Sequence, residues 1–298
     1  MDTQWDDLKV FLAVARNESL SGAGRVLKVD PATVGRRIAR LEETLRVPLF
    51  AKSPQGYALT NPGQRLLVQA MRAEQEMEAA FEDMSGQGRQ LSGQIRLAAP
   101  DGSANFLLPQ VCAAIVEQNP DLDVQIVALP RVVNLSKREA DMAITVSPPT
   151  AGRLSVQKLT DYKLHIVAAR RYLRFAAPIN SRDDLRHHRF VGYIQDMIFD
   201  KELDYLSEAG LDKVDLASNS VAVQFNWIQQ AAGIGFMHDF AIPFGKRLMK
   251  VLPDEISLTR SFYLVRHADD RRLERLNRFA DALAAGVKAE VARLEEEA

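Results

Sequence analysis

Four side chains with hydrogen-bonding groups recur at helical spacing near the start of the chain: Thr33, Arg36, Arg37 and Arg40. Steps of three and four residues make side chains neighbours on a helix surface. An arginine fork can pair with O6 and N7 of a guanine, and a guanidinium can also contact phosphate. Basic helix faces are equally typical of plain solvated surface. The elements around these residues must therefore decide what the basic face does.

The four residues lie in a segment with strong signals for a helix that begins after Asp30 and ends before Pro48. The Asp30 side chain can accept from the free N–H groups of a first turn, and Pro31 at the first helical position has no N–H to leave unpaired. Apolar residues form a stripe on the opposite side: Val34, Ile38, Leu41 and Leu45. This stripe predicts a buried face, with the basic residues turned to solvent.

Two helices are predicted before this one, and a hairpin after it. Apolar spacing from Trp5 to Arg16 indicates a first helix, and Ser21 is expected to cap a second short helix in which Gly24 permits close approach of a neighbour. Short strands at 49–52 and 56–60 flank a turn. This order predicts a winged helix-turn-helix whose third helix enters the major groove of DNA. The predicted DNA-binding residues are Ser21, Pro31, Ala32, Thr33, Arg36, Arg37, Arg40 and Lys52.

A long helix is predicted from Asn61 to about Met84, before a linker at 85–88. Residues in steps of three and four form a seam along it: Leu67, Ala70, Glu74, Met77, Phe81 and Met84. A lone helix could not bury this seam, which favours a two-stranded coil that joins a homodimer. Such a dimer would present two DNA-binding heads to half-sites spaced by whole helical turns. The alternative is that the seam packs on the C-terminal part of its own chain.

Beyond residue 88, short apolar strands alternate with helices, which predicts an α/β domain with mostly parallel strands. The predicted strands are 94–99, 122–129, 140–146, 164–168, 190–193, 233–237 and 261–266, and the predicted helices are 105–118, 221–232 and 270–297. Ligands of such sheets bind beyond the carboxyl ends of the strands, beside the starts of helices. The sequence therefore predicts a small-molecule site at that edge.

Polar side chains at these places are the candidate effector-binding residues: Ser103, Thr145, Ser147, Gln195, Ser218, Asn219 and Ser220. The free N–H groups of two predicted helix starts, at 100–103 and 218–220, would suit a small organic anion. The same residues could be ordinary helix caps. Asp101 beside this anion site would instead favour a cationic or neutral ligand. His238 and Arg131 are further candidates for the wall of the site.

Other classes of protein are disfavoured by the sequence. It contains no Gly-x-Ser-x-Gly elbow, no Gly-rich phosphate loop and no His-Glu-x-x-His motif, so neither an enzyme nor a bound metal or cofactor is expected. The single cysteine, Cys112, lies among apolar residues and is expected to be a buried side chain in a reducing compartment. The acidic start of the chain and the lack of a long apolar run favour a cytoplasmic protein over a membrane protein or an exported solute-binding protein.

Residues 5–63 contain a longer pattern, made up of Ala23, Leu27, Val34, Arg36, Ile38, Leu41-Glu42, Leu45, Val47-Pro48-Leu49-Phe50 and Leu59-Thr60-Asn61-Pro62-Gly63. This pattern resembles the N-terminal module of the LysR-type transcriptional regulators. The resemblance covers essentially the full chain. It implies an all-α winged helix-turn-helix domain and an α/β effector domain with two periplasmic-binding-protein-like lobes. It also implies double-stranded promoter DNA and a small-molecule effector as partners, with a homodimer or homotetramer as the assembly.

The resemblance implies a DNA-binding domain over 1–61, a linker helix and hinge over 62–88, and an effector domain over 89–298, with lobe I at about 92–161 and 267–298 and lobe II at about 162–266. Most members begin the third helix with a Ser-Gln-Pro-Ala-like run and have a serine before the first arginine. This chain has Asp30-Pro31-Ala32-Thr33 and Gly35 there, so a different base preference should follow. Gly35 costs the helix about 1 kcal/mol relative to Ala, which predicts close approach of DNA or of another helix.

Overall fold

The computed structural model describes residues 5–53, 56–84, 91–128, 140–211 and 213–298. The chain divides into two compact units. Of the described residues, the N-terminal unit contains 5–53, 56–84 and 269–274, and the C-terminal unit contains the rest. No described helix has an apolar stretch long enough to cross a lipid bilayer.

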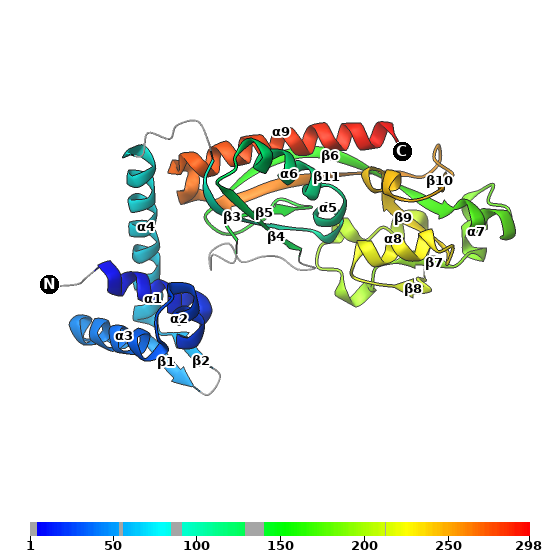
Figure 1. Ribbon diagram of the computed structural model, residues 1–298. Helices are drawn as coiled ribbons and strands as arrows, with labels where there is room; N and C mark the ends of the chain where they lie inside the picture. Colours follow the sequence, from blue (N-terminus) through cyan, green and yellow to red (C-terminus); the bar gives the residue numbers. More distant parts are fainter. Residues whose placement is uncertain (1–4, 54–55, 85–90, 129–139, 212) are drawn as a thin grey trace. The chain divides into compact units, whose positions relative to one another are not determined.

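The N-terminal unit consists, in its described residues, of helices and one antiparallel hairpin (Figure 1). The elements are α1 (Trp5–Asn17), α2 (Leu20–Leu27), α3 (Pro31–Leu45), β1 (Phe50–Ser53), β2 (Gly56–Leu59) and α4 (Asn61–Met84). The predicted order of three helices, a hairpin and a long helix is confirmed. Each predicted boundary differs from the observed one by only a few residues.

Side-chain caps explain where α2 and α3 begin. Asp30 Oδ1 accepts a hydrogen bond from the backbone N of Ala32 at 2.8 Å, and Pro31 is the first residue of α3, as predicted. The capping prediction for α2 is wrong, because Ser19 and not Ser21 accepts from a backbone N–H of the first turn. Ser21 lies inside that turn with an exposed side chain. Its hydroxyl is therefore not needed as the cap.

The helices of this unit pack around one apolar core. The predicted stripe of α3 is confirmed, since three of its residues are almost fully buried and the last packs at the edge of the core: Val34, Ile38, Leu41 and Leu45. Phe11 of α1 is fully buried, and its ring centroid lies 5.3 Å from that of Phe50 in β1. One face of α3 is thus fixed in the core, which leaves its other face exposed.

The start of α4 is fixed by contacts with the residues that lead into β1. The backbone N of Thr60 donates to the carbonyl of Leu49 at 2.9 Å, and Thr60 Oγ1 accepts from the N of Gly63 at 3.1 Å. Gly63 lies so close to this strand that a Cβ on it would be 2.1 Å from the Leu49 oxygen. Glu42 Oε1 accepts from the N of Leu49 at 2.7 Å and of Phe50 at 3.1 Å. These contacts give a physical reason for several residues of the family pattern.

The C-terminal unit is built on one mixed nine-stranded sheet in the order β4-β3-β5-β11-β6-β9-β7-β8, with β10 also paired to β6. The strands are β3 (Gly93–Ala99), β4 (Leu122–Ala128), β5 (Met142–Thr145), β6 (Leu154–Ala169), β7 (Phe190–Gly192), β8 (Leu216–Ala217), β9 (Ile234–His238), β10 (Leu248–Val251) and β11 (Ser257–His267). The α-helices are α5 (Asp101–Phe106), α6 (Leu108–Gln118), α7 (Arg170–Phe175), α8 (Val221–Gln229) and α9 (Glu274–Glu296). Short 3₁₀ helices are η2 (Arg182–His187), η3 (Gln195–Met197), η4 (Lys201–Leu203), η5 (Ser207–Ala209), η6 (Asp239–Phe244) and η7 (Ala268–Arg272).

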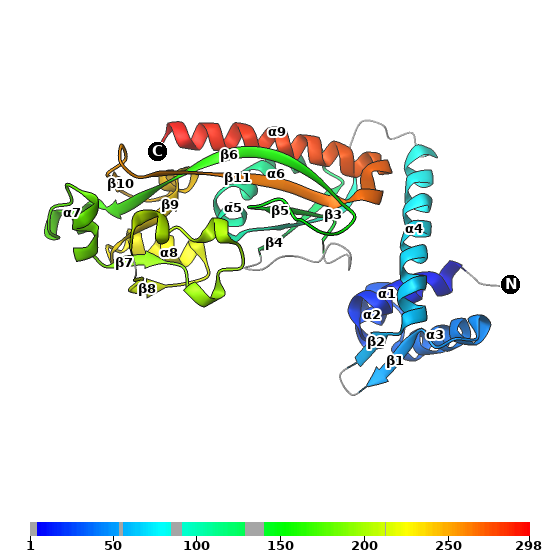
Figure 2. The same cartoon turned by 180° about the vertical axis from the view of Figure 1, so that it is seen from behind.

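Two long antiparallel strands, β6 and β11, run through the middle of this sheet (Figures 1 and 2). We call β4-β3-β5 the first half-sheet and β9-β7-β8 the second half-sheet. Within each half-sheet the strand pairs are parallel, whereas every pair made by β6 or β11 is antiparallel. The prediction of mostly parallel strands is therefore right only for the half-sheets. The sequence predicts short strands here, but β6 has 16 residues and β11 has 11.

The prediction of a single helix over 105–118 is also wrong, because two helices occupy this region. Helix α5 begins at Asp101, and Leu107 with φ −126° and ψ −52° separates it from α6. Pro109 lies in the first turn of α6, where proline is tolerated, although it could not continue a preceding helix. Consequently Asp101 lies at the start of a helix, directly beyond the carboxyl end of β3.

Helix α9 runs along the β6–β11 pair (Figures 1 and 2). One face of this helix is buried through residues in steps of three and four: Leu276, Phe279, Leu283, Val287, Val291 and Leu294. Near its end, Glu295 Oε1 accepts from the backbone N of Lys163 in β6 at 2.7 Å. The charged helix predicted over 270–297 thus packs on the C-terminal unit through one apolar stripe.

The close packing at Gly63 predicts a difference between two glycine substitutions. Gly63→Ala should lower the free energy of unfolding of the N-terminal unit by more than about 2 kcal/mol, because backbone atoms must move. Gly35→Ala should change it by less than about 1 kcal/mol, because a Cβ there meets only the flexible Leu20 Cδ1 at 3.3 Å and helix propensity improves. Urea titrations followed by Trp5 fluorescence in a Trp227→Phe background would measure both. Equal effects would contradict the packing at Gly63.

Candidate DNA-binding helix and effector site

Thr33 and Arg36 form an exposed polar pair near the start of α3. Arg36 is exposed, Thr33 is half-buried, and an Arg36 Nη donates to Thr33 Oγ1 at 3.0 Å. The two residues are one helical turn apart and lie opposite the buried stripe. Pro31 and Ala32 are exposed in the first turn of the same helix. The structure therefore brings these four predicted residues together on one end of α3.

Arg37 and Arg40 are turned toward α1 instead. Arg40 makes a bidentate contact with Asp7, in which Nε donates to Oδ2 at 2.8 Å and an Nη donates to Oδ1. The hydrogen bond with Asp7 raises the pKa of Arg40, against a smaller effect of desolvation. Asp7 is only 3% exposed. Arg37 has a longer contact of 3.7 Å with the exposed Asp6.

Sequence reasoning missed the role of Asp7. Asp7 lies four residues before Phe11, on the stripe of α1 that faces the core. A carboxylate on an apolar stripe is costly unless a cation pairs with it, so its position was a detectable signal for a buried ion pair. The two remaining predicted DNA-binding residues are Ser21, exposed in α2, and Lys52, whose backbone lies in β1 and whose side chain is outside the described residues.

Part of the predicted seam of α4 is used inside the N-terminal unit. Ala70 is 1% exposed and Leu67 packs against the same core as α1. Glu74 forms an ion pair with Arg16 of α1, with one N–O distance of 3.2 Å. The side chains of Phe81 and Met84 are outside the described residues. The prediction that the seam pairs two subunits stays a prediction.

Two of the predicted effector-binding residues use their hydroxyls within their own loops. Ser103 is fully buried, and its Oγ donates to the carbonyl of Pro100 at 3.0 Å. Thr145 Oγ1 donates to the carbonyl of Ser147 at 2.7 Å. Both contacts are ordinary turn hydrogen bonds. These two hydroxyls are already engaged without a ligand.

Two other predicted residues connect the two half-sheets. Ser147 follows β5 and its Oγ donates to Asp200, which precedes η4. Ser220 caps α8, and its Oγ donates to Asp101 Oδ2 at 3.0 Å. The N of Ala222 donates to the same oxygen at 3.0 Å. The start of α8 is therefore bonded to a carboxylate from α5.

The loop before α8 is stabilised from within. Ser218 Oγ accepts from the N of Ser220 at 3.1 Å, and Gln224 Nε2 donates to the carbonyl of Ser218 at 2.7 Å. Asn219 lies half-buried between the two serines. The structure thus brings 218–220 close to Asp101, while Arg131 lies outside the described residues.

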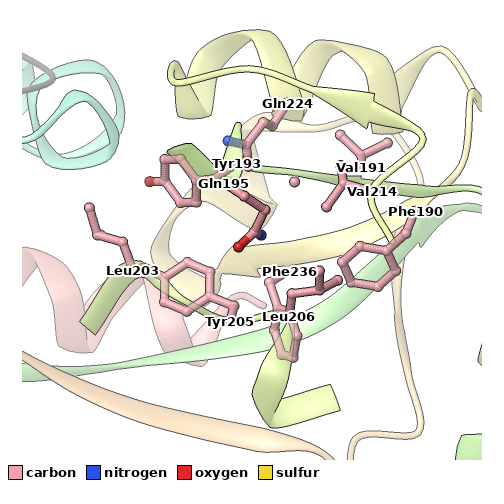
Figure 3. Close-up of a pocket in the computed structure, with 11 residues that line it drawn as sticks. Phe190, Val191, Tyr193, Gln195, Leu203, Tyr205, Leu206, Val214, Gln224 and Phe236 are labelled. Carbon is pink, nitrogen blue, oxygen red and sulfur yellow. The ribbon is translucent and has the colours of Figure 1, made fainter. Parts of the chain in front are cut away.

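A small cavity lies in the second half-sheet (Figure 3). It is lined by Phe190, Val191, Gly192, Tyr193, Gln195, Leu203, Tyr205, Leu206, Val214, Gln224 and Phe236. Figure 3 shows the Gln195 amide pointing into the middle of these residues. The space suffices for about one water molecule. Gln195 is the predicted effector residue that the lining includes.

Three buried polar groups lie in the C-terminal unit: the hydroxyls of Tyr162 and Tyr205, which interact with each other, and His238 Nδ1, which has no hydrogen-bond partner among the described residues. The His238 ring centroid lies 5.4 Å from that of Tyr162, and a Cβ on Gly102 would lie 2.9 Å from His238 Cε1. Burial lowers the pKa of His238 to about 4, against a smaller upward effect of Asp239. Burial also raises the pKa of both tyrosines. All three groups are therefore uncharged at neutral pH, and no periodic pattern in the sequence marks the tyrosines.

The single cysteine has an environment unlike that of a reactive thiol. Cys112 lies on the buried face of α6 and is 6% exposed. Burial raises its pKa to about 11. Because the thiolate is the reactive form, Cys112 is a packing residue at neutral pH, as the sequence predicts.

Comparisons with known proteins define the class of the chain. Residues 5–64 match the bacterial regulatory helix-turn-helix protein, lysR family, and residues 88–288 match the LysR substrate binding domain. The HTH-type transcriptional regulator PtxR of Pseudomonas aeruginosa is 25% identical over 254 residues, which cover 83% of this chain and 81% of PtxR. The transcriptional activator TtdR of Escherichia coli is 27% identical over 255 residues, with 83% and 82% covered.

Solved structures have the same fold. CrgA, a LysR-type transcriptional regulator from Neisseria meningitidis, matches with a TM-score of 0.58 at 23% identity, covering 95% of this chain and 98% of CrgA. Full-length LysG from Corynebacterium glutamicum, with bound effector Arg, matches with a TM-score of 0.61 at 17% identity, covering 95% and 98%. The chain belongs to the LysR family. It is a DNA-binding transcription regulator with a C-terminal effector-binding domain.

The buried neutral His238 predicts a pH dependence of stability. An unfolded histidine has a pKa near 6.5 and binds a proton that the folded state, with a pKa of about 4, does not bind. The contribution to stability is therefore present above pH 6.5 and is lost as the pH falls toward 4. Between pH 7 and pH 5 it amounts to about 2 kcal/mol.

Urea titrations at pH 7 and pH 5 would measure this effect on the C-terminal unit. The loss of stability on acidification should be about 2 kcal/mol smaller in His238→Phe than in the wild type. His187→Phe, at an exposed position, is the matched control and should keep the wild-type pH dependence. The same pH dependence in His238→Phe and the wild type would contradict the assignment of a neutral buried His238.

Proposed function

We propose that α3 contacts base edges in the major groove through Thr33 and Arg36. The observation that carries this proposal is the exposed hydrogen-bonded pair of these two side chains at the start of a capped helix. A guanidinium fork suits guanine, and a hydroxyl can bond either partner of a base pair. Pro31 and Ala32, exposed in the first turn, are proposed to make apolar contacts at the groove.

For Arg40 we infer a positioning role. Its guanidinium satisfies both oxygens of the buried Asp7, so it fixes α3 against α1. Removal of Arg40 would leave a buried carboxylate without a cation, which is costly. Arg37, with its longer contact, keeps the freedom to reach a phosphate. Ser21 and Lys52 are proposed as further phosphate contacts beside the groove.

The proposed assembly is a homodimer joined through α4, and two dimers would form a homotetramer. The support is the exposed apolar surface of this helix, where Val68 is 50% exposed, together with the family of the chain. Because Leu67 and Ala70 already pack in the core of their own unit, the dimer contact would use the exposed face of α4 instead. Paired heads would then bind half-sites spaced by whole helical turns.

The proposed effector site lies where α5 and α8 begin. A buried polar group without a partner, His238 Nδ1, is expected to bond a ligand or water there. A small organic anion, one class that the sequence suggested, would need the N–H groups at the start of α8. Binding would change the position of one half-sheet relative to the other, and thereby the arrangement of the DNA-bound oligomer.

A regulatory role without catalysis is proposed, because the relatives that match the chain are named as transcriptional regulators. The proposed place of action is the cytoplasm, where bacterial promoter DNA is found. Among the described residues there is no group of three His, Cys, Asp or Glu side chains that could hold a metal ion.

Gel-shift titrations of the full chain on a duplex selected from random sequence would test the role of α3. Arg36→Ala should weaken binding about 5–150-fold, equivalent to about 1–3 kcal/mol, and relax the preference at one base pair. Its effect on bulk genomic DNA should be smaller. Arg171→Ala, at an exposed position on α7 of the C-terminal unit, is the control and should bind normally.

The salt dependence separates positioning from phosphate contact. Arg40→Ala should destabilise the N-terminal unit but leave the slope of log affinity against log salt unchanged, whereas a phosphate contact would reduce the slope by about one. Arg37→Ala should reduce the slope.

Unaltered affinity and base preference in Arg36→Ala would count against the assignment of α3 as the DNA-binding helix.

A further inference from the structure

The start of helix α8 is already bonded to an anion that the chain itself provides. Asp101 Oδ2 accepts from Ser220 Oγ and from the N of Ala222, each at 3.0 Å. The other oxygen accepts from Asn105 Nδ2 at 3.1 Å. The carboxylate therefore uses the donors that a ligand carboxylate would need at this helix start.

Asp101 reaches α8 from the other half of the sheet. It is the first residue of α5, which follows β3 in the first half-sheet, whereas α8 packs beside the second half-sheet. Most helices are capped by a residue in their own chain segment, and α8 has such a cap in Ser220. The contact with Asp101 is thus additional to ordinary capping.

Three buried polar side chains of the same unit are uncharged at neutral pH: Tyr162, Tyr205 and His238. Tyr162, Tyr205 and His238 are each more than nine-tenths buried. The two tyrosine hydroxyls interact with each other, whereas His238 Nδ1 has no hydrogen-bond partner in the described part of the chain. Tyr205 also lines the cavity of Figure 3, whose lining residues are all uncharged. Unpaired buried groups of this kind are expected to bond a ligand or ordered water.

Arg260, a described cation that acts on the Tyr205 hydroxyl, is already paired with carboxylates and is not available to an anionic ligand. Arg260 of β11 has Nε 3.0 Å from Glu202 Oε2 and an Nη 3.1 Å from Glu208 Oε1, and its side chain is 14% exposed. An anion brought into this region would lose its hydration and meet the charge of Asp101 without a compensating cation.

We propose that Asp101 serves as a built-in anion of the effector site and excludes carboxylate and phosphate ligands from the start of α8. The effector of this chain then presents uncharged hydrogen-bonding groups, one of which meets the unpartnered ring nitrogen of His238. The proposal rests on the proposed effector-binding function of this domain. It makes Asp101 a specificity-determining residue.

Acetate is a suitable probe, because it carries the same carboxylate as the Asp101 side chain. Thermal unfolding of the full chain would be followed in sodium acetate and in sodium chloride at equal ionic strength. Asp101→Ser should gain a saturable rise in Tm with acetate, of about 3–5 °C at ten times Kd, because the N–H of Ala222 becomes free. The wild type and the exposed-site control Asp196→Ser should show no saturable rise.

Two outcomes would overturn the proposal: equal saturable stabilisation by acetate in the wild type and Asp101→Ser, or none in a folded Asp101→Ser. Should Asp101→Ser be unfolded in chloride, recovery of the folded state in acetate supports the proposal, and its absence counts against it. Asp101→Asn keeps an acceptor oxygen at α8 and should fold without gaining acetate binding. The acetate titration contains no DNA, so its result is independent of DNA binding. Failure of the wild type to bind any selected duplex would instead refute the proposed function.

Discussion

The antiparallel pair of β6 and β11 is the constraint on which the C-terminal unit depends. Both half-sheets are hydrogen-bonded to this pair, so the positions of α5 and α8 are set by the register of two strands. That register shifts between Phe262 and Tyr263, where the backbone departs from regular pairing. Because the half-sheets share these strands, Asp101 on one side can reach the start of α8 on the other.

An ion pair has the corresponding role in the N-terminal unit. The buried stripe of α3 fixes one face of the helix, but a stripe alone permits some rotation and sliding. The two-pronged contact of Arg40 with Asp7 removes that freedom. Arg36 and Thr33 are then left at the exposed end of a helix whose orientation is set. The structure thus separates two arginines that the sequence spacing places on one face: Arg36 is exposed, and Arg40 is paired with Asp7.

The sequence predicts those elements whose signals are local. Asp30 and Pro31 mark the start of α3, and the apolar stripe of that helix gives its buried face. Local signals do not predict the length of β6. Its first half includes exposed residues, which adopt a strand conformation through pairing with β11. The partner of Asp101 lies more than one hundred residues away at Ser220 and Ala222, and no periodic pattern relates such distant positions. Hydrogen bonds across the sheet follow from tertiary structure, so local signals in the sequence indicate Ser103 as a candidate but do not reveal the contact of Asp101 with α8.

The most direct measurement of the central claim is a crystal structure of the full chain bound to a selected DNA duplex. We expect α3 to lie in the major groove, with Arg36 at hydrogen-bonding distance from a base edge, Thr33 beside it, and Arg40 still paired with Asp7. A complex in which α3 lies away from the duplex, or in which Arg36 packs within its own molecule, would contradict the account.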